Sequence, residues 1–243
     1  MRALDRVIAI LEAVAAGPGP VSTAAVASQV GISLSTVSRL MRELAEQGLL
    51  DREGSSGTYM LGGRLMALVR TATEPSNLLR IALPVMESLR DKTQETVSLH
   101  VRSGDSRVCI AEVQSLKPVR RVVPLGLVLP LHFGATGEVL LAGLSPAAIQ
   151  DYLARVKLPA RDSKALQTRL DQCRKNGWLM AVDSWVEGLA GIAAQVRSSD
   201  TDVASLAVSG PSFRWTAAAM NQHREAVVAA AHTISVLMAN GRA

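Results

Sequence analysis

The chain has 243 residues, of which 48% are hydrophobic and only 3% aromatic. This composition predicts one or two folded domains with an aliphatic core, and it excludes disorder over most of the length. The apolar stretch 122–137 is interrupted by Pro124 and Pro130 and is shorter than the roughly 20 residues that a bilayer span needs. Cys109 and Cys173 lack metal-ligand spacing, so we expect a reduced, cytoplasmic protein without metal, cofactor or membrane association.

The net charge is +5, from 26 basic and 21 acidic residues, which favours an anionic partner. This excess does not lie in the N-terminal part, because residues 1–74 hold seven arginines, no lysine and seven acidic residues. Bulk charge therefore does not predict nucleic-acid binding by this part. Only the local placement of its arginines can do so.

The first elements expected along the chain are three helices. Apolar residues recur at helical spacing over 2–16, and a glycine–proline run ends this helix. Ser22 is a candidate N-cap for a short second helix, and Gly31 supplies a tight turn. Ser33 is the candidate cap of a third helix with an apolar stripe on one side. The second and third helices therefore predict a helix-turn-helix.

A hairpin is expected next, from the runs 49–52 and 58–61 across the small turn residues 54–57. Such a hairpin fits a wing that lies along a DNA backbone or in the minor groove. The helices and the hairpin together predict a winged helix-turn-helix over residues 1–60.

The polar side of the third helix is chemically suited to a DNA groove. Small hydroxyl side chains permit close approach, and an arginine fork matches the edge of guanine. We expect Arg39 to read a base and Arg42 to contact phosphate, with Glu43 and Glu46 turned away from the DNA. The alternative is an ordinary helical hairpin with a solvated polar face. The candidate DNA-binding residues are Ser22, Ser33, Ser35, Thr36, Ser38, Arg39, Arg42, Arg52 and Ser55.

Residues 61–74 return to a helical pattern, and Pro75-Ser76-Asn77 marks a boundary. The remainder has runs of strands with helices at both ends, which predicts an α+β domain with an antiparallel sheet. Helices are expected at about 78–92, 137–144, 147–155, 164–176 and 216–238, and strands at 96–101, 108–113, 119–123, 189–196 and 203–209.

A ligand site is expected where the glycine- and proline-rich stretch 125–137 leads into a helix near Gly137. The unpaired N–H groups of a helix N-terminus attract anions, so a carboxylate ligand would sit there. Gln195 and Ser209 are isolated polar residues in apolar strand-like runs, which suits a small-molecule pocket. In the alternative interpretation, these two side chains satisfy nearby backbone groups.

Other reactive side chains do not predict an enzyme. His100 and Cys109 lie on neighbouring strand-like runs, but a buried cysteine that packs as a small hydrophobe is far commoner than a thiol nucleophile. His100 and His132 lack the clustered spacing of metal ligands. Arg120 and Arg121 suit either the attraction of an acidic ligand or DNA, or a solvated strand end.

Six segments of the chain resemble, in the same order, the IclR family of bacterial transcriptional regulators: 3–15, 32–50, 59–68, 129–142, 175–196 and 206–214. The resemblance implies a DNA-binding domain at 1–60, a linker helix at 61–76 and a GAF-like effector-binding domain at 77–243. Two positions depart from the family pattern, because Glu138 stands where lysine is usual and Phe133 where a small residue is common. The effector contacts that the resemblance implies are Leu129, Ala135, Thr136, Trp185, Gln195 and Ser209.

The resemblance also implies a DNA-binding regulator whose affinity for its operator changes with a small organic or aromatic acid. A homodimer or homotetramer is expected, on a roughly palindromic double-stranded operator. The apolar faces of helices 2–16 and 61–74 are the candidate dimer contacts. Phe133 and Trp185 either stack on a flat ligand or fill the cavity. The alternative function is a DNA-binding dimer whose second domain only dimerises and binds no effector.

Overall fold

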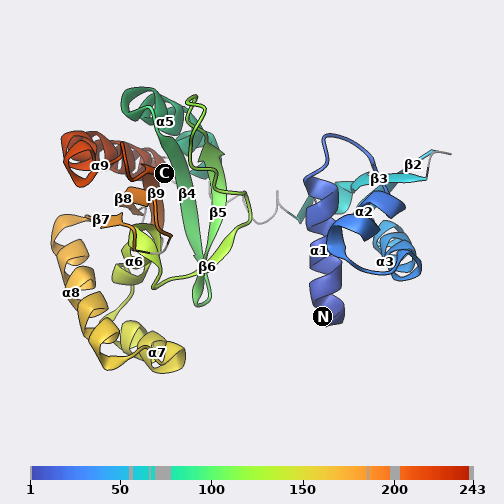
Figure 1. Ribbon diagram of the computed structural model, residues 1–243, viewed down its shortest axis with the longest axis horizontal. Coiled ribbons are helices and arrows are strands. Elements are labelled where there is room, and N and C mark those ends of the chain that lie inside the picture. The colour runs from blue at the N-terminus through green and yellow to red at the C-terminus, as the bar shows by residue number, and fades with distance from the viewer. Residues whose placement is uncertain are drawn as a thin grey trace. The chain divides into compact units, whose positions relative to one another are not determined.

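The computed structural model describes residues 2–54, 57–65, 67–68, 78–184, 186–197 and 203–240. The chain divides into two compact units, Met1–Pro75 and Ser76–Ala243, which are coloured from blue to cyan and from green to red in Figure 1. Ser55, Trp185 and much of the expected linker helix lie outside the described residues. None of the helices in the described part of the chain is long and apolar enough to cross a bilayer.

The N-terminal unit is a winged helix-turn-helix, as the sequence predicts. Its elements are α1 (Ala3–Ala15), β1 (Val21–Ser22), α2 (Thr23–Val30), α3 (Leu34–Glu46), β2 (Leu50–Glu53) and β3 (Thr58–Leu61). The strands pair antiparallel in the order β1-β3-β2. The Ser22 hydroxyl accepts a hydrogen bond from the Ala25 N–H at 3.2 Å and so caps α2. Gly31 ends α2 with a φ of +66°, a conformation that glycine adopts without a Cβ clash.

The chain leaves the wing through a close backbone crossing at Gly62. A Cβ atom there would lie 2.2 Å from the Gly48 carbonyl oxygen, so only glycine fits. Residues 63–65 are helical and begin the expected linker helix, which starts after β3 rather than at position 61. The Arg64 guanidinium donates to the Gln47 carbonyl at 3.0 Å and ties this segment to the end of α3.

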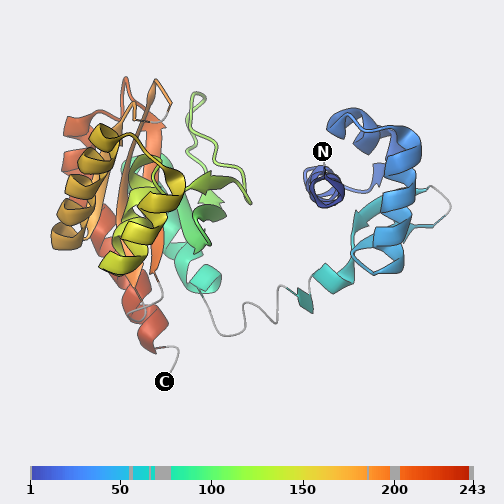
Figure 2. The ribbon, with the colours of Figure 1, turned by 90° about the horizontal axis from the view of Figure 1, so that it is seen from below.

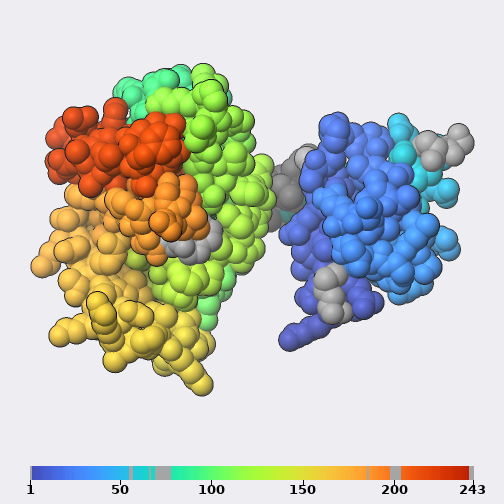
Figure 3. Space-filling model, in the orientation of Figure 1, coloured from blue at the N-terminus to red at the C-terminus, as the bar shows by residue number. Residues whose placement is uncertain are grey.

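Helix α1 buries only part of the apolar face that its sequence predicts. Ile10 and Val14 are buried against α2 and α3, whereas Leu4 and Ile8 are 70% and 48% exposed. The first turns of α1 form a dark blue projecting end of the unit in Figure 3. The described part of this unit therefore leaves an apolar strip of α1 uncovered.

The C-terminal unit is an α+β domain, and its described strands form a six-stranded antiparallel sheet. Its elements are α5 (Leu78–Thr93), β4 (Thr96–Ser103), β5 (Ser106–Val113), β6 (Val128–Pro130), α6 (Gly134–Ala142), α7 (Pro146–Val156), α8 (Ala160–Asn176), β7 (Trp178–Val182), β8 (Leu189–Arg197), β9 (Val203–Pro211) and α9 (Ala217–Asn240). The strand order is β6-β5-β4-β9-β8-β7.

Helices cover both faces of this sheet (Figures 1 and 2). Helices α5 and α9 pack on one face, and α6 and α8 pack on the other. Successive strand residues point to opposite faces, so Leu206 belongs to the core under α5 and α9 while Ala207 belongs to the core under α6. The face that α6 covers carries the candidate ligand site.

Three details differ from the expected elements. Residues 119–123 do not form a strand, and the edge strand is β6 instead. The backbone of residues 119–123 forms hydrogen bonds with side chains instead of with a strand. The Thr96 hydroxyl donates to the Arg121 carbonyl at 2.6 Å, and the Val123 N–H donates to the Glu112 carboxylate. Strand β7 was not expected, and α6 begins at Gly134 rather than near Gly137.

Candidate functional site

The solvent-facing side of α3 carries the serines and arginines expected to bind DNA. Ser33, Ser35 and Arg42 are exposed, while Thr36 and Ser38 are half-buried. Ser33 Oγ lies 2.9 Å from Thr36 Oγ1. Ser33 occupies the N-cap position of α3 but makes no side-chain bond to the backbone. These hydroxyls therefore stay at the surface of α3.

Arg39 is paired within its own helix. Its Nη1 lies 2.7 Å from Glu43 Oε1, and the two side chains are 64% and 52% exposed. Residues four apart lie on the same side of a helix, so Glu43 lies beside Arg39, and the expectation that Glu43 and Glu46 face away from the DNA stays a prediction. An exposed pair of this kind contributes at most about 1 kcal/mol, so Glu43 holds Arg39 only weakly.

Leu34 is a surface residue of α3 that the sequence argument missed. Its side chain is 54% exposed at the first position of the helix. An apolar side chain at this place suits contact with a thymine methyl group. The exposure of Leu34 could have been predicted, because position 34 does not belong to the stripe of buried residues Val37, Leu40, Met41 and Leu44.

The wing presents one basic residue between two acidic ones. Arg52 is exposed and lies opposite Tyr59 in the β2–β3 register, with Asp51 and Glu53 on either side. Ser55 lies outside the described residues. Arg52 and Ser22 are the two described candidates outside α3. The Arg52 side chain is exposed to solvent, whereas the Ser22 hydroxyl oxygen accepts the capping hydrogen bond of α2.

A cavity of about 90 Å³ lies between the sheet and the start of α6. Four of the expected effector contacts line it: Leu129, Ala135, Thr136 and Ser209. Polar residues that the sequence argument did not assign to a ligand also line it: Ser98, His100, Arg107 and Ser184. Arg121 lines the cavity as well and is half-buried outside any strand, so it is not the solvated strand end of the other interpretation.

Gln195 and Phe133 are not among the residues that line this cavity. The Gln195 side chain donates to the Val139 carbonyl of α6 at 3.2 Å, so it bonds to nearby backbone as the alternative interpretation holds. Phe133 is 36% exposed, and its ring centroid lies 4.3 Å from that of His132. Trp185 lies outside the described residues.

The first turn of α6, where the sequence predicts an anion site, borders the cavity. Phe133 stands at the N-cap and provides no side-chain cap, so the first N–H groups have no side-chain acceptor. Gly137 fits close packing here, since a Cβ atom would lie 2.4 Å from the Leu131 carbonyl oxygen.

The opposite wall of the cavity contains buried titratable groups on β4 and β5. Burial, together with the positive charges of Arg107 and Arg121, lowers the pKa of His100 to about 3, so the imidazole is neutral at physiological pH. Burial also lowers the pKa of Arg107 to about 10, which leaves the guanidinium charged. Burial raises the pKa of Cys109 to about 11, and its thiol donates to the Ala111 carbonyl at 3.4 Å. Cys109 is thus a protonated, buried thiol and not an activated nucleophile.

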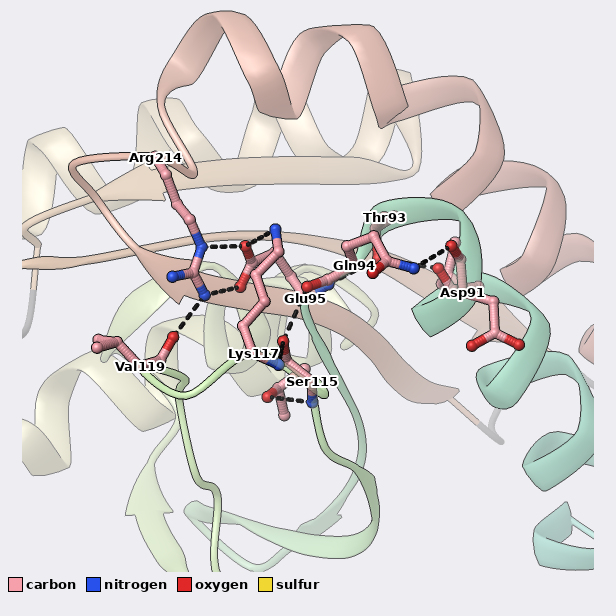
Figure 4. Close-up of polar contacts among 10 residues, drawn as sticks. Asp91, Thr93, Gln94, Glu95, Ser115, Lys117, Val119 and Arg214 are labelled. Atoms are coloured by element: carbon pink, nitrogen blue, oxygen red, sulfur yellow. Dashed lines mark hydrogen bonds and ion pairs between the residues drawn. The ribbon is translucent and has the colours of Figure 1, made fainter.

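The segment between β5 and β6 carries Arg121 and is held by a buried carboxylate (Figure 4). Glu95 is 1% exposed, and its oxygens lie 2.5 and 2.9 Å from the Arg214 guanidinium and 3.3 Å from Lys117 Nζ. Arg214 also donates to the Val119 carbonyl at 2.7 Å. This cluster ties the first part of the segment to the end of β4 and to the residues after β9.

Glu138, the departure from the family pattern, has a compensating partner. Its carboxylate lies 2.6 Å from Arg169 Nε on α8, and Arg169 also donates to the Met180 carbonyl at 3.0 Å. Burial raises the pKa of Glu138, while Arg169 opposes that shift. No group of three or more potential metal ligands occurs in the described part of the chain.

Two family models match the chain. The IclR helix-turn-helix domain matches residues 3–54, and the C-terminal domain of the bacterial transcriptional regulator IclR matches residues 70–236. Among solved structures, the fold is similar to that of the IclR protein of Thermotoga maritima, with a TM-score of 0.72, 24% identity and coverage of 97% of this chain and 98% of that one. An IclR homolog from Microbacterium hydrocarbonoxydans, complexed with 4-hydroxybenzoate, has a TM-score of 0.74, 23% identity and coverage of 98% and 99%.

Curated relatives agree with this assignment. The chain is 31% identical to the HTH-type transcriptional regulator TtgV of Pseudomonas putida over 88% of this chain and 83% of that protein. It is 27% identical to the transcriptional repressor IclR of Escherichia coli over 97% and 89% of the two chains. These relatives are regulators and not enzymes. The chain belongs to the IclR family of DNA-binding transcriptional regulators.

Proposed function

We propose that this regulator binds a roughly palindromic operator as a homodimer, and that a small organic acid in the cavity changes its affinity for that operator. The observation that carries the proposal is the cavity itself, which gathers Leu129, Ala135, Thr136 and Ser209 from three separate elements. A ligand there acts on DNA binding only as far as it binds one arrangement of the DNA-binding units more tightly than the other. A regulator of this kind acts in the bacterial cytoplasm, where its operator lies.

In this proposal α3 enters the major groove. Arg39 reads a base edge after it leaves Glu43, and Arg42 contacts phosphate. Arg52, with residue 55 of the wing, approaches the adjacent backbone. Ser33, Ser35, Thr36 and Ser38 contribute hydroxyl groups along the groove wall.

The second copy of the chain is proposed to cover the exposed strip of α1. Leu4 and Ile8 are large apolar side chains that the described part of their own unit leaves open to solvent. A two-fold dimer through this strip sets two copies of α3 against two half-sites, which is why the operator is expected to be palindromic. A homotetramer built from two such dimers is the alternative assembly.

The proposed effector is an organic acid, because basic groups line the cavity together with apolar side chains. Arg107 and Arg121 supply positive charge, and Leu129 and Ala135 supply apolar wall. The structural neighbour with bound 4-hydroxybenzoate supports an acid as the ligand class. Repression is the proposed sign of regulation, in line with the relatives named as repressors.

The experiment begins with selection of operator fragments from random double-stranded DNA by the full-length protein. Fluorescence anisotropy then measures the affinity for the selected fragment with and without carboxylic acids that raise the melting temperature. We expect a two-fold symmetric motif whose dissociation constant changes with the acid. An affinity that no stabilising acid alters would contradict effector control.

The second candidate function is a DNA-binding dimer whose C-terminal unit only dimerises. The uncovered strip of α1 favours it as much as it favours the first candidate, because dimerisation is common to both. A broad screen by thermal shift separates them, since a true effector raises the melting temperature of the native state that binds it. A protein that binds the operator but is stabilised by no small molecule would fit the second candidate.

A further inference from the structure

Three buried side-chain polar atoms in the described part of the chain have no hydrogen-bond partner, and they lie on one face of the sheet. They are His100 Nδ1, Arg107 Nε and Ser205 Oγ. Ser205 pairs with His100 across β9 and β4, and His100 pairs with Cys109 across β4 and β5. Arg107 is two residues from Cys109 and therefore points to the same face. Unpaired buried polar atoms are rare in native proteins, so three on adjacent strands indicate a place that a polar ligand or water completes.

Arg107 is the unusual member of this group. It is 6% exposed, and among the described residues no carboxylate lies within ion-pair distance of its guanidinium. The nearby carboxylates are already engaged. Glu112 accepts from the Val123 N–H and from Gln114, and Asp105 accepts two bonds of 2.7 Å from Arg155. A buried charge without a partner is costly to the folded state.

The groups that face Arg107 make the cavity wall positive. Arg121 lines the same cavity, and both His100 and Arg107 have their pKa lowered by this second guanidinium. The neutral His100 bonds Ser98 Oγ through Nε2 at 3.0 Å, which leaves Nδ1 without a hydrogen-bond partner. A monovalent carboxylate placed here would accept two parallel hydrogen bonds from the buried guanidinium fork.

We propose that Arg107 anchors the carboxylate of the effector at the β5 wall of the cavity, with the apolar part of the ligand directed toward Leu129 and Ala135. This inference rests on the proposed function of the cavity as an effector site. It places the anion on the sheet and not at the N-terminus of α6, where the sequence pattern placed it. The cavity of about 90 Å³ is smaller than the roughly 150 Å³ that holds a benzene ring, which favours a short-chain monocarboxylic acid.

The test compares acids with their neutral amides. Full-length protein is heated with sodium acetate, propionate, butyrate or benzoate, each matched by acetamide, propionamide, butyramide or benzamide, at constant ionic strength. The proteins are the wild type, Arg107→Gln, Arg107→Met and the control Arg102→Gln. Arg102 lies opposite Arg107 in the β4–β5 register but is exposed, and it donates to the Gly104 carbonyl.

We expect the short acids, and not their amides, to raise the melting temperature of the wild type and of Arg102→Gln. Both Arg107 variants should lose this response, with a rise in the apparent dissociation constant of at least about tenfold, as for loss of a charge-assisted bidentate contact. Without ligand, Arg107→Met should melt at or above the wild-type temperature, because it removes an unpaired buried charge. An arginine needed only for folding would instead lower it.

Three outcomes would overturn the proposal, and they differ in what they leave standing. A preserved acid response in Arg107→Gln assigns the anion to another group, while the effector function survives. Stabilisation by amides alone makes the site neutral, and the effector function again survives. The absence of stabilisation by any of the acids or amides, or by a broad neutral library, removes the effector function together with the anchor.

Discussion

The outer face of α3 and the wall of the cavity differ in how the chain builds them. The α3 face comes from ten consecutive residues, 33–42, whose polar side chains are displayed by helical periodicity alone. The cavity wall draws on β4, β5, α6 and β9, which are far apart in the chain. The first surface is therefore a local property of the sequence, while the second exists only when the sheet has formed.

The two regions also differ in how far their charged side chains are exposed to solvent. The Arg39–Glu43 pair stands in solvent, where ion pairs are weak and easily exchanged for a phosphate. In the C-terminal unit, Glu95 is buried against Arg214, and Arg107 is buried without a carboxylate among the described residues. Substitutions in the cavity wall should consequently change stability, whereas substitutions on α3 should change only DNA affinity.

The largest effect is expected for Glu95→Ala. This change leaves Arg214 without its buried partner and releases the 115–123 segment, so we expect a loss of about 3–5 kcal/mol in the free energy of unfolding. Urea denaturation measures it. Glu87→Ala, at an exposed position of α5, is the control and should stay within about 0.5 kcal/mol of the wild type. Equal effects of the two changes would remove the distinction between buried and exposed charge.

Arg39→Ala should weaken operator binding by about 1–3 kcal/mol and relax the preference for one base, which is roughly a 5- to 150-fold rise in the dissociation constant. The free energy of unfolding should not change. Arg42→Ala is the matched comparison, because a phosphate contact should weaken all sequences alike and reduce the salt dependence. An unaltered base preference in Arg39→Ala would assign the reading of bases to another part of α3.

Glu138→Lys tests the departure from the family pattern. Lysine beside Arg169 replaces attraction with repulsion, so we expect a loss of about 1–3 kcal/mol in the free energy of unfolding, reduced by screening at the partly exposed Arg169. The double variant Glu138→Lys with Arg169→Glu should recover most of this loss in the same denaturation assay. Additive effects without recovery would show that the two side chains are not coupled.

The smallest effect is expected for Glu43→Gln, which removes the acidic partner of Arg39 on the exposed face of α3. Removing this carboxylate releases Arg39 and lowers the repulsion of phosphate, so operator affinity should rise about two- to fivefold, less than about 1 kcal/mol. Anisotropy at low salt measures the rise, and added salt should shrink it. Weaker binding by the variant would mean that Glu43 holds Arg39 in the geometry that DNA requires.

Much of the architecture followed from local sequence signals. Ser22 and Gly31 mark the ends of α2, and the apolar stripe of α3 fixed which of its residues face solvent. The antiparallel α+β domain followed from the alternation of strand-like and helical segments. The strand expected at 119–123 failed because its apolar composition says nothing about where its backbone hydrogen bonds go.

Helix periodicity and turn chemistry act over a few neighbouring residues, so local patterns were enough to predict the winged helix-turn-helix and the exposed polar residues of α3. The exposure of Leu4 and Ile8 of α1, with Val14 buried, depends instead on how the helices of the folded unit pack together. Tertiary structure alone brought Arg107 and His100 to the wall of one cavity. The physical reason is that the pairing of β4, β5 and β9 sets which residues become neighbours, and that register depends on contacts between distant segments of the chain.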